Sequence, residues 1–430
     1  MMTRPLYRFT IAAAIALCAP TYASADWPTF RGADRTGVAD AENLLDSWPA
    51  GGPPLVWETS GAGRGYASPA VADGRIYTLG DGLSTAPDAD EYLSCFDQAT
   101  GRQLWSAKTG PAWNEGQQSW QSSRSTPTID GDRVYLITPF GMLHCFDTSG
   151  KSRWKVDLKQ QFGGQKADIW GYSESPLIDG DRLICTPGGE DATMVALDKN
   201  TAKLIWKAAR GGTQEGGGQV GAGHASVVLS TIGGTKVYVQ TTGSGAMGVR
   251  AEDGQLMWTY NIDRTTAVIP TPIVRDDLVF VVAGYGRGGA LLRQVPSGDK
   301  ISVKEVYALQ KDLANKHGGV VLVGDYLYGD SDDKGIPYCA DLMTGEIRWK
   351  SRGSGKGSAA VSAADGHLYF LYADGVMTLV KADPSKFQEA GNFEVPHSGD
   401  RPSWAHPVIT DGKLLVRQGD YILCYDVSKK

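Results

Sequence analysis

One aromatic residue recurs along this chain at a nearly constant spacing. The recurring set is Trp57, Trp105, Trp154, Trp206, Trp258 and Trp349. Consecutive members stand 48 to 52 residues apart, except for one gap of 91 residues that has Tyr307 near its middle. Self-similarity at such a period indicates one supersecondary unit copied many times. This copying constrains the fold more than any single motif in the sequence does.

Most of these tryptophans close a repeated phrase. In Cys95–Trp105 and again in Cys339–Trp349, a cysteine precedes an Asp, a Thr-Gly pair and, four residues after the glycine, the Trp. Ahead of each phrase stand a small residue, often a proline, and two apolar stretches separated by a Gly/Asp turn. Eight such starts occur, at Ser68, Thr126, Ser175, Ala225, Thr271, Val320, Val361 and His406. Short apolar stretches separated by hairpin turn residues predict four strands in each unit.

Four-stranded units of this length are typical of β-propeller blades. The chain ends shortly after Tyr425-Asp426, before the eighth unit has a fourth strand, and an unpaired fourth strand stands near the start, at Pro54–Glu58. Pairing the two would complete the ring and leave no open edge. The sequence therefore predicts an all-β, eight-bladed β-propeller of four-stranded antiparallel blades over residues 54–430, closed by its N- and C-terminal strands. Residues 26–53 are expected to form an extension that packs on the propeller.

The closing aromatics are expected to dock neighbouring blades against each other. With the two degenerate members added, the set is Trp57, Trp105, Trp154, Trp206, Trp258, Tyr307, Trp349 and Phe393. Truncating such a buried ring to Ala is expected to cost roughly 3–5 kcal/mol. A cofactor-stacking role is the alternative for this set, and the regular repetition favours packing.

The first 25 residues have the pattern of a secretory signal. Arg4 and Arg8 precede a short apolar segment, and Ala23-Ser-Ala25 fits a cleavage site. We expect export to the periplasm or the exterior after cleavage near Ala25, with no transmembrane segment. The net charge of −6 disfavours nucleic acid as a partner, since such partners require a basic surface. A monomer is expected.

The cysteines predict packing rather than cross-linking. Cys95, Cys145, Cys339 and Cys424 occupy one repeat position, two residues before an Asp. Equivalent positions in different blades lie farther apart than the ~7 Å between Cα atoms that a disulfide tolerates. We expect them to be small buried hydrophobes.

On the repeated phrase, from Trp57 to Asp426, the chain resembles the pyrroloquinoline-quinone-like (PQQ-like) repeat propellers. Its opening Asp26–Gly32 resembles a secreted, planctomycete-type subgroup. The resemblance implies two kinds of function: quinoprotein dehydrogenases hold the quinone and Ca²⁺ at the mouth of the ring, whereas the propeller lipoprotein of the outer-membrane β-barrel assembly machinery is non-catalytic. The adjacent Cys-Cys pair usual in the dehydrogenases does not occur in this sequence. No residue here is assigned to their Ca²⁺ ligands.

Two glycine fingerprints and one acidic stretch suggest ligand sites but fit loops better. Gly243–Gly248 and Gly284–Gly289 match G-x-G-x-x-G, yet a strand follows each, so the helix N-terminus of a dinucleotide site is missing. We interpret them as loops between the second and third strands of two blades. Asp330–Gly335 has Lys334 where a calcium loop needs an oxygen ligand, and it is interpreted as an acidic turn.

The remaining candidate site is the mouth of the ring, where the connections into the first strands of the blades converge. These connections carry Arg64, Tyr66, Gln121, Arg124, Trp170, Tyr172, Glu174, His224, Lys316, His317, Lys356, Trp404 and His406. Histidines from alternate blades are expected to lie too far apart to share a metal, which would need each nitrogen within about 2.1 Å. A polar hydrogen-bonding funnel is the structural interpretation of this set. A site for a small polar or anionic ligand is the functional one.

Two functions follow. The first is an exported, non-catalytic binding or scaffold propeller that uses this funnel for a ligand or protein partner in the cell envelope, without a cofactor or metal. The alternative is a PQQ-dependent dehydrogenase of an alcohol or sugar, with PQQ and Ca²⁺ bound. Fold resemblance alone does not decide between them.

Overall fold

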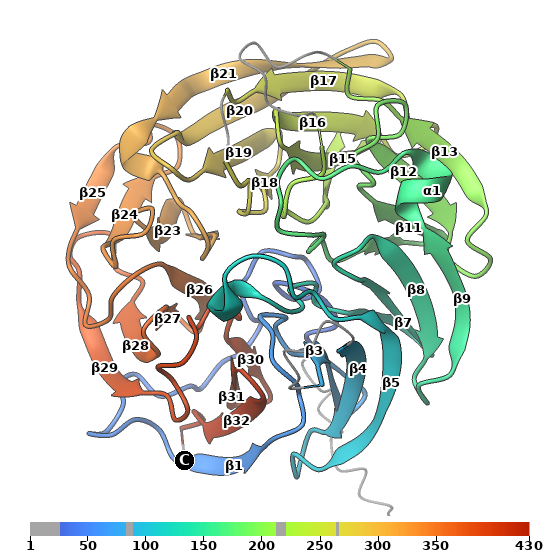
Figure 1. Ribbon diagram of the computed structural model, residues 1–430. Helices are drawn as coiled ribbons and strands as arrows, with labels where there is room; N and C mark the ends of the chain where they lie inside the picture. Colours follow the sequence, from blue (N-terminus) through green and yellow to red (C-terminus); the bar gives the residue numbers. More distant parts are fainter. Residues whose placement is uncertain (1–25, 83–88, 212–220, 264–265, 430) are drawn as a thin grey trace, which may run out of the picture.

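The computed structural model describes residues 26–82, 89–211, 221–263 and 266–429. Its strands form eight four-stranded antiparallel sheets arranged radially around one axis (Figure 1). The predicted all-β, eight-bladed β-propeller is confirmed. The predicted signal peptide, residues 1–25, lies outside the described residues. Among the helices that are described, none has the length and apolar composition needed to cross a bilayer.

The first four blades each contain four strands that are consecutive in the chain. Blade 1 consists of β2 (Ala70–Ala72), β3 (Arg75–Asp81), β4 (Asp90–Asp97) and β5 (Gln103–Pro111). Blade 2 consists of β6 (Thr128–Asp130), β7 (Arg133–Ile137), β8 (Met142–Asp147) and β9 (Ser152–Asp157). Blade 3 consists of β10 (Leu177–Asp179), β11 (Arg182–Cys185), β12 (Met194–Asp198) and β13 (Leu204–Ala208). Blade 4 consists of β14 (Val228–Ile232), β15 (Thr235–Thr242), β16 (Gly245–Arg250) and β17 (Leu256–Asn261).

The last four blades differ only in that the eighth takes one strand from the N-terminal side. Blade 5 consists of β18 (Ile273–Arg275), β19 (Leu278–Ala283), β20 (Gly288–Ser297) and β21 (Lys300–Gln310). Blade 6 consists of β22 (Val320–Val323), β23 (Tyr326–Asp330), β24 (Pro337–Asp341) and β25 (Ile347–Lys350). Blade 7 consists of β26 (Ala359–Ala364), β27 (His367–Tyr372), β28 (Val376–Lys381) and β29 (Glu389–Glu394). Blade 8 consists of β30 (Val408–Thr410), β31 (Lys413–Gln418), β32 (Tyr421–Asp426) and β1 (Leu55–Thr59). The short helical turns are α1 (Leu158–Phe162), Gln118–Trp120 and Lys311–Leu313.

The ring closes as predicted, because β1 pairs with β32 and Trp57 lies opposite Cys424. A buried arginine reinforces this closure. Arg417 on β31 is 1% exposed and donates to the main-chain carbonyls of Ala62, Gly63, Ala67 and Leu79, all in or before blade 1. A guanidinium carries five N–H donors, so it can satisfy several carbonyls that would otherwise be buried without partners.

The repeated phrase is explained by three local contacts. The Asp closes a turn: Asp97 accepts hydrogen bonds from the backbone N–H and the hydroxyl of Thr100. The glycine has a positive φ, and it leaves room for the aromatic of the preceding blade, since a Cβ on Gly101 would lie 2.5 Å from the Trp57 ring. A bulge lies beside the Trp, at the register shift of Cys95/Phe96 opposite Trp105, and the Trp105 ring reaches the Thr148 carbonyl of the next blade.

The tryptophan side chains then bridge neighbouring blades through their indole N–H groups. Trp105, Trp154, Trp206 and Trp349 each donate to a carbonyl of the following blade or of the turn after its third strand, on Thr148, Lys199, Ala251 and Asp383 respectively. Of the eight closing aromatics, Trp206, Trp258 and Phe393 are buried and the other five are half-buried. The expected cost of roughly 3–5 kcal/mol on truncation therefore applies to these three, because a half-buried ring has less apolar area to lose.

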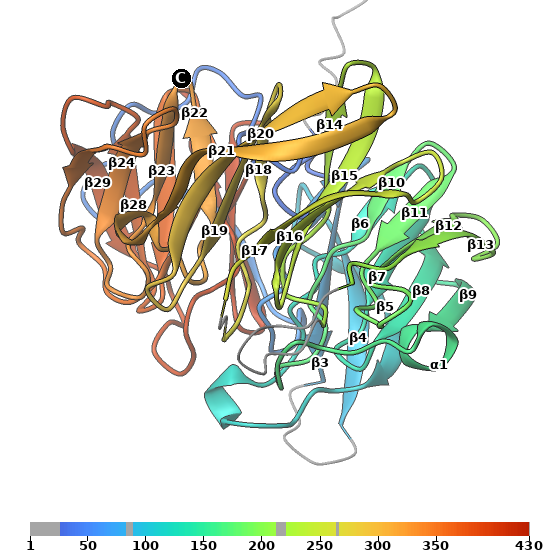
Figure 2. The same cartoon turned by 90° about the horizontal axis from the view of Figure 1, so that it is seen from above.

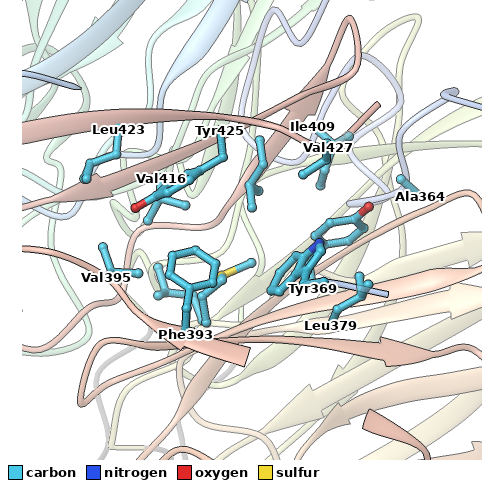
Figure 3. Close-up of a cluster of buried hydrophobic side chains, with 14 of the residues drawn as sticks. Ala364, Tyr369, Leu379, Phe393, Val395, Ile409, Val416, Leu423, Tyr425 and Val427 are labelled. Carbon is cyan, nitrogen blue, oxygen red and sulfur yellow. The ribbon is translucent and has the colours of Figure 1, made fainter. Parts of the chain in front are cut away.

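The hydrophobic core is divided among the blade interfaces. Figure 3 shows one such cluster, in which Tyr369, Leu379 and Phe393 of blade 7 face Val416 and Leu423 of blade 8. The five described cysteines are buried and unpaired. Four of them lie opposite the closing aromatic of their own blade, which accounts for their repeat position.

Both glycine fingerprints lie where the sequence predicts. Gly243–Gly248 spans the turn between β15 and β16, and Gly284–Gly289 spans the turn between β19 and β20. The acidic stretch Asp330–Gly335 joins β23 to β24. These connections lie between the second and third strands of their blades.

Candidate functional site at the mouth of the ring

A cavity of about 190 Å³ lies at the mouth, near the axis of the propeller. One ordered water needs roughly 10–15 Å³ by this measure, so the cavity is large enough for a small organic molecule. We call it the mouth cavity. It is lined by Phe30, Tyr66, Trp120, Arg124, Trp170, Ser173, His224, Ala267, Ile269, Tyr285, Lys316, His317, Asp333, Trp404 and His406. The turn that carries Trp120 projects from this end of the ring (teal in Figure 2).

The N-terminal extension forms the floor of the mouth cavity. Its residues 27–38, which we call the axial segment, bridge to Val71 in blade 1 and to Ala363 in blade 7. Phe30 in this segment lines the cavity and contacts the His406 ring edge-on at 4.9 Å. The axial segment therefore fills the axis beneath the mouth with backbone and side chains.

Two buried arginines hold the axial segment in place. Arg35 is 3% exposed and donates to the carbonyls of Ser175, Pro176 and Val227, at the starts of blades 3 and 4. Arg31 is 2% exposed and donates to the carbonyls of Thr36 and Val320. Burial lowers the pKa of each guanidinium to about 10, and in Arg35 the Glu174 carboxylate partly offsets this shift, so both stay charged at neutral pH.

Aromatic rings make up much of the cavity wall. Trp404 stacks on His317 with 4.3 Å between ring centroids and lies 5.0 Å from Tyr66. Trp120 contacts Trp170 edge-on at 5.3 Å and lies 6.4 Å from Trp404. These rings come from loops of different blades, so the wall exists only once the ring has closed. Such a surface suits a planar or apolar ligand face.

Positive charges are interleaved with the aromatic wall. Arg124 lies 5.7 Å from the Tyr66 ring centroid, and Arg401, just outside the lining, lies 5.1 Å from the same ring. Lys316 lies 4.9 Å from the Tyr285 ring and forms an ion pair with Asp333 at 2.8 Å. These contacts place cations against ring faces, where the aromatic quadrupole attracts them.

The charge balance of the mouth is slightly positive. Lys166, behind the lining, donates to the Gly223 carbonyl, and burial lowers the pKa of its ammonium to about 8. Among the residues that line the cavity, Arg124 and Lys316 stand against the carboxylate of Asp333, an excess of one positive charge (two against one).

The three mouth histidines are neutral at neutral pH. Burial, together with the nearby Lys166 and Arg124, lowers the pKa of His224 to about 4. Burial likewise lowers the pKa of His317 to about 3, aided by Lys316, and that of His406 to about 3, aided by Arg31. Neutral imidazoles can accept as well as donate hydrogen bonds.

Two of these histidines bind serines in different ways. His224 lies with Nε2 2.8 Å from Asp168 Oδ2, and its Nδ1 contacts the hydroxyl of Ser173. His317 Nδ1 lies 3.0 Å from the Ser358 hydroxyl, which also contacts Asp333. Ser173 is partly exposed on the cavity wall, whereas Ser358 is 1% exposed.

Eight of the thirteen residues predicted for the funnel line the mouth cavity: Tyr66, Arg124, Trp170, His224, Lys316, His317, Trp404 and His406. The other five lie elsewhere. Arg64 pairs with Asp81 at 2.7 Å, and Gln121 donates to the Asn114 carbonyl. Tyr172 is 1% exposed in the core between blades 2 and 3, and Lys356 is exposed outside the lining.

Glu174, the fifth, is buried behind the mouth. It is 2% exposed and accepts hydrogen bonds from the backbone N–H and hydroxyl of Thr186 and from the Gln240 amide. Burial raises the pKa of this carboxyl to about 7. Its hydrogen bonds hold blades 3 and 4 together rather than facing the cavity.

Seven lining residues were not predicted from the sequence: Phe30, Trp120, Ser173, Ala267, Ile269, Tyr285 and Asp333. Two of them lie in stretches that were interpreted as simple turns. Tyr285 belongs to the second glycine fingerprint and Asp333 to the acidic stretch, and Asp332 accepts hydrogen bonds from the N–H groups of Tyr285 and Gly286. Loops between second and third strands reach the mouth as well, so the position of these two loops in the repeat is the sequence signal for both residues.

Among the described residues, one carboxylate, that of Asp333, lines the mouth cavity. Calcium takes six to eight oxygen ligands from carboxylates, carbonyls and waters. Asp333 lines the cavity, but its carboxylate already accepts from Lys316 and Ser358. Within residues 26–82, 89–211, 221–263 and 266–429, no group of three His, Cys, Asp or Glu side chains is arranged to hold a metal.

Comparisons with known proteins agree with this fold. A family model described as outer membrane protein assembly factor BamB matches residues 23–112 and 89–351. The BamB of Bordetella pertussis is 23% identical over 275 residues, which are 64% of this chain and 62% of that protein. The match thus spans less than two thirds of the length of this curated relative.

Solved structures with the same architecture include both kinds of PQQ-like propeller. BamB from Moraxella catarrhalis superposes with a TM-score of 0.59 at 14% identity, covering 87% of this chain and 99% of that one. A europium-containing methanol dehydrogenase superposes with a TM-score of 0.65 at 13% identity, covering 91% and 89%. The quinohemoprotein alcohol dehydrogenase from Comamonas testosteroni gives 0.62 at 13% identity, covering 94% and 81%. At these identities the structures show the fold alone, whereas the family model matches most of the sequence, and the chain belongs to the PQQ-like β-propeller family that this model, described as outer membrane protein assembly factor BamB, represents.

Proposed function

We propose that this chain is an exported binding or scaffold propeller whose mouth cavity holds a small ligand with a planar apolar face and an anionic group. The mouth cavity carries this proposal, because aromatic rings from several blades converge there with an excess of positive charge. The axial segment closes the cavity from below, so a ligand would enter from the mouth side.

The cations in the cavity wall give the physical basis for an anionic ligand. Lys316 and Arg124 lie against aromatic rings in a partly dehydrated site, where a charge interacts more strongly than in bulk water. The neutral histidines add hydrogen-bonding groups without repelling an anion. A ligand with an aromatic ring and a carboxylate would contact both the aromatic wall and the cations of the cavity.

The cellular role that we propose is in the envelope. The signal-like first 25 residues support export, with cleavage near Ala25. The name of the matched family, an outer membrane protein assembly factor, supports a protein partner there. The loops that surround the mouth cavity would then present the ligand-bearing end of the ring to that partner.

Calorimetric titration with 4-hydroxybenzoate tests the ligand proposal. We expect binding of this anion and at least about tenfold weaker binding of 4-hydroxybenzamide, which has the same shape without the charge, since tenfold corresponds to about 1.4 kcal/mol. Trp404→Ala and Lys316→Ala should each weaken binding. Lys356→Ala is the matched control, because Lys356 is exposed outside the cavity and should leave the affinity unchanged.

The same protein tests the dehydrogenase alternative. It is incubated with pyrroloquinoline quinone and Ca²⁺, and dye reduction is followed with ethanol and glucose. Turnover would replace our proposal with a quinone-dependent dehydrogenase. Failure of the benzoate series to bind, or equal affinity in Trp404→Ala and wild type, would also contradict the ligand proposal.

A further inference from the structure

Three side chains at the edge of the mouth cavity form a continuous hydrogen-bonded chain. Asp168 and Ser173 lie in the loop that leads from α1 into blade 3, and His224 precedes the first strand of blade 4. The carboxylate of Asp168 accepts from His224 Nε2 at 2.8 Å and from the backbone N–H of Trp170 at 3.0 Å. The other imidazole nitrogen, Nδ1, contacts the Ser173 hydroxyl.

The partners of His224 fix its tautomer. The carboxylate of Asp168 can only accept, and its pKa is held well below the usual value by His224 and Lys166 despite burial, so it stays ionised. His224 must then carry its proton on Nε2, which leaves Nδ1 as an acceptor for the O–H of Ser173. The order of roles, nucleophile to base to orienting carboxylate, is that of a Ser-His-Asp triad with the two imidazole nitrogens exchanged.

Exposure distinguishes Ser173 from the other serine that binds a mouth histidine. Ser173 is partly exposed on the cavity wall, and His224 lines the same cavity. Ser358 also contacts a histidine, but it is buried, and its hydroxyl is shared with Asp333 instead of being aligned by a separate carboxylate behind the imidazole. Of these two arrangements, the one at Ser173 places a hydroxyl, a base and an orienting acid in series with the hydroxyl facing open space.

We propose that Ser173 is a nucleophile that attacks small esters held in the mouth cavity, with His224 as general base and Asp168 as the positioning residue. This inference goes beyond the proposed binding function, since it assigns reactivity to one edge of the cavity. The aromatic wall beside it favours esters with an aromatic acyl or alcohol group.

The reaction balances with water as the only co-reactant. Ser173 Oγ forms a bond to the ester carbonyl carbon while its proton passes to His224 Nδ1. The bond from the carbonyl carbon to the alcohol oxygen then breaks, and the leaving alkoxide takes the proton from Nδ1. Water attacks the acyl-serine and gives a proton to Nδ1, and the Ser173–acyl bond breaks as Ser173 Oγ recovers that proton. The products are the carboxylic acid and the alcohol.

Positive charge next to this group would stabilise the tetrahedral oxyanion. Arg124 donates to the carbonyl of Trp170, three residues before Ser173. Lys166 is close enough to influence the pKa of both Asp168 and His224. Arg124 and Lys166 already donate hydrogen bonds to carbonyls, so these two residues would act on the oxyanion mainly through their charge.

Labelling with a fluorophosphonate reagent tests the nucleophile directly. The full chain is exposed to the reagent, and the adduct is located by intact mass and peptide mapping. We expect one adduct, on Ser173, which is lost in Ser173→Ala and kept in Ser358→Ala. Ser173→Ala removes a single oxygen atom from a partly exposed side chain, so folding should be preserved, and circular dichroism checks this. A folded wild-type protein without an adduct, or an adduct on another serine, overturns the proposal.

Hydrolysis of 4-nitrophenyl benzoate tests the base and its orienting acid. We expect Ser173→Ala and His224→Gln to lose at least about 10²-fold in rate, within the range that proton transfer by a positioned side chain contributes. Asp168→Asn should slow the reaction and move the acid limb of the pH–rate profile to lower pH, because the carboxylate no longer stabilises the imidazolium. Equal rates in wild type and Ser173→Ala overturn the proposal, and an unmoved pH profile in Asp168→Asn overturns the role of Asp168.

The two proposals fail separately. Labelling and ester hydrolysis do not require affinity for 4-hydroxybenzoate, and benzoate binding does not require the Ser173 hydroxyl. Loss of labelling with intact benzoate binding therefore refutes the nucleophile alone, and the reverse result refutes the anion site alone.

Discussion

The outer blade interfaces and the mouth of the ring come from the same eight repeats, but they use repetition in opposite ways. At the interfaces, equivalent positions make equivalent contacts, as when Trp105, Trp154 and Trp206 each donate to a carbonyl of the following blade. At the mouth, the connections into successive blades carry different side chains, such as Arg124, Ser173 and His224. A contact that every blade repeats maintains the ring, whereas residues that differ from blade to blade can build one asymmetric site.

Replacing one tryptophan at a blade interface and one at the mouth gives the largest expected difference between the two regions. Trp206→Ala should lower the free energy of unfolding by roughly 3–5 kcal/mol, because the ring is buried between blades 3 and 4 and its N–H bonds the Ala251 carbonyl. Trp170→Ala, at the partly exposed mouth, should cost about 1 kcal/mol or less. Urea unfolding measures both. Equal losses in the two variants would mean that the mouth rings support the fold as much as the interface rings do.

A second test concerns the glycine that receives the ring. Gly254 has φ +77° and a Cβ there would lie 2.6 Å from the Trp206 ring, so Gly254→Ala combines backbone strain with a clash. We expect a loss of about 2–4 kcal/mol. Gly180→Ala is the matched control, since φ is +60° with no atom within 4 Å of the added Cβ, and it should cost only about 1–2 kcal/mol. Thermal unfolding of the pair isolates the contact, and identical melting temperatures would show that the indole shifts without cost.

The smallest effect concerns the pH response of the mouth. The folded state holds His406 neutral with a pKa of about 3, whereas the unfolded chain binds a proton near the ordinary value of about 6.5. The unfolded state therefore gains protons first as the pH falls, and stability decreases from about pH 6.5 downward. His406→Gln should remove about 1–2 kcal/mol of the loss between pH 7 and pH 5.

This prediction is read as a difference between wild type and variant. Glu91, Glu174 and Asp330 have folded-state pKa values raised to about 7 by burial, so they stabilise the fold as the pH falls and partly mask the histidines. Their contribution is the same in both proteins and cancels in the difference. Parallel stability curves for the two proteins between pH 7 and pH 5 would contradict a neutral, buried His406.

The closing aromatics and the Asp-x-x-Thr-Gly turns could be predicted because their chemistry is local. Asp97 closes its turn with Thr100, three residues away, and the period of the phrase gives the number of blades. The mouth could be predicted only in part. The connections into the first strands identify Tyr66, Trp404 and His406, but Phe30 and Tyr285 reach the cavity from an N-terminal segment and from a turn between second and third strands. Phe30 lies outside the repeats, so nothing in its sequence neighbourhood places it there.

The sequence by itself determined the ring, its eight blades and its closure, since each of these depends on strand periods and turns that repeat within about 50 residues. Only the tertiary structure decided what the mouth contains. Ser173, His224 and Asp168 come together across the boundary between two blades, and Arg31 and Arg35 bind carbonyls more than a hundred residues away in sequence. Contacts between loops depend on how the ring closes around its axis, and that geometry leaves no periodic trace in the sequence.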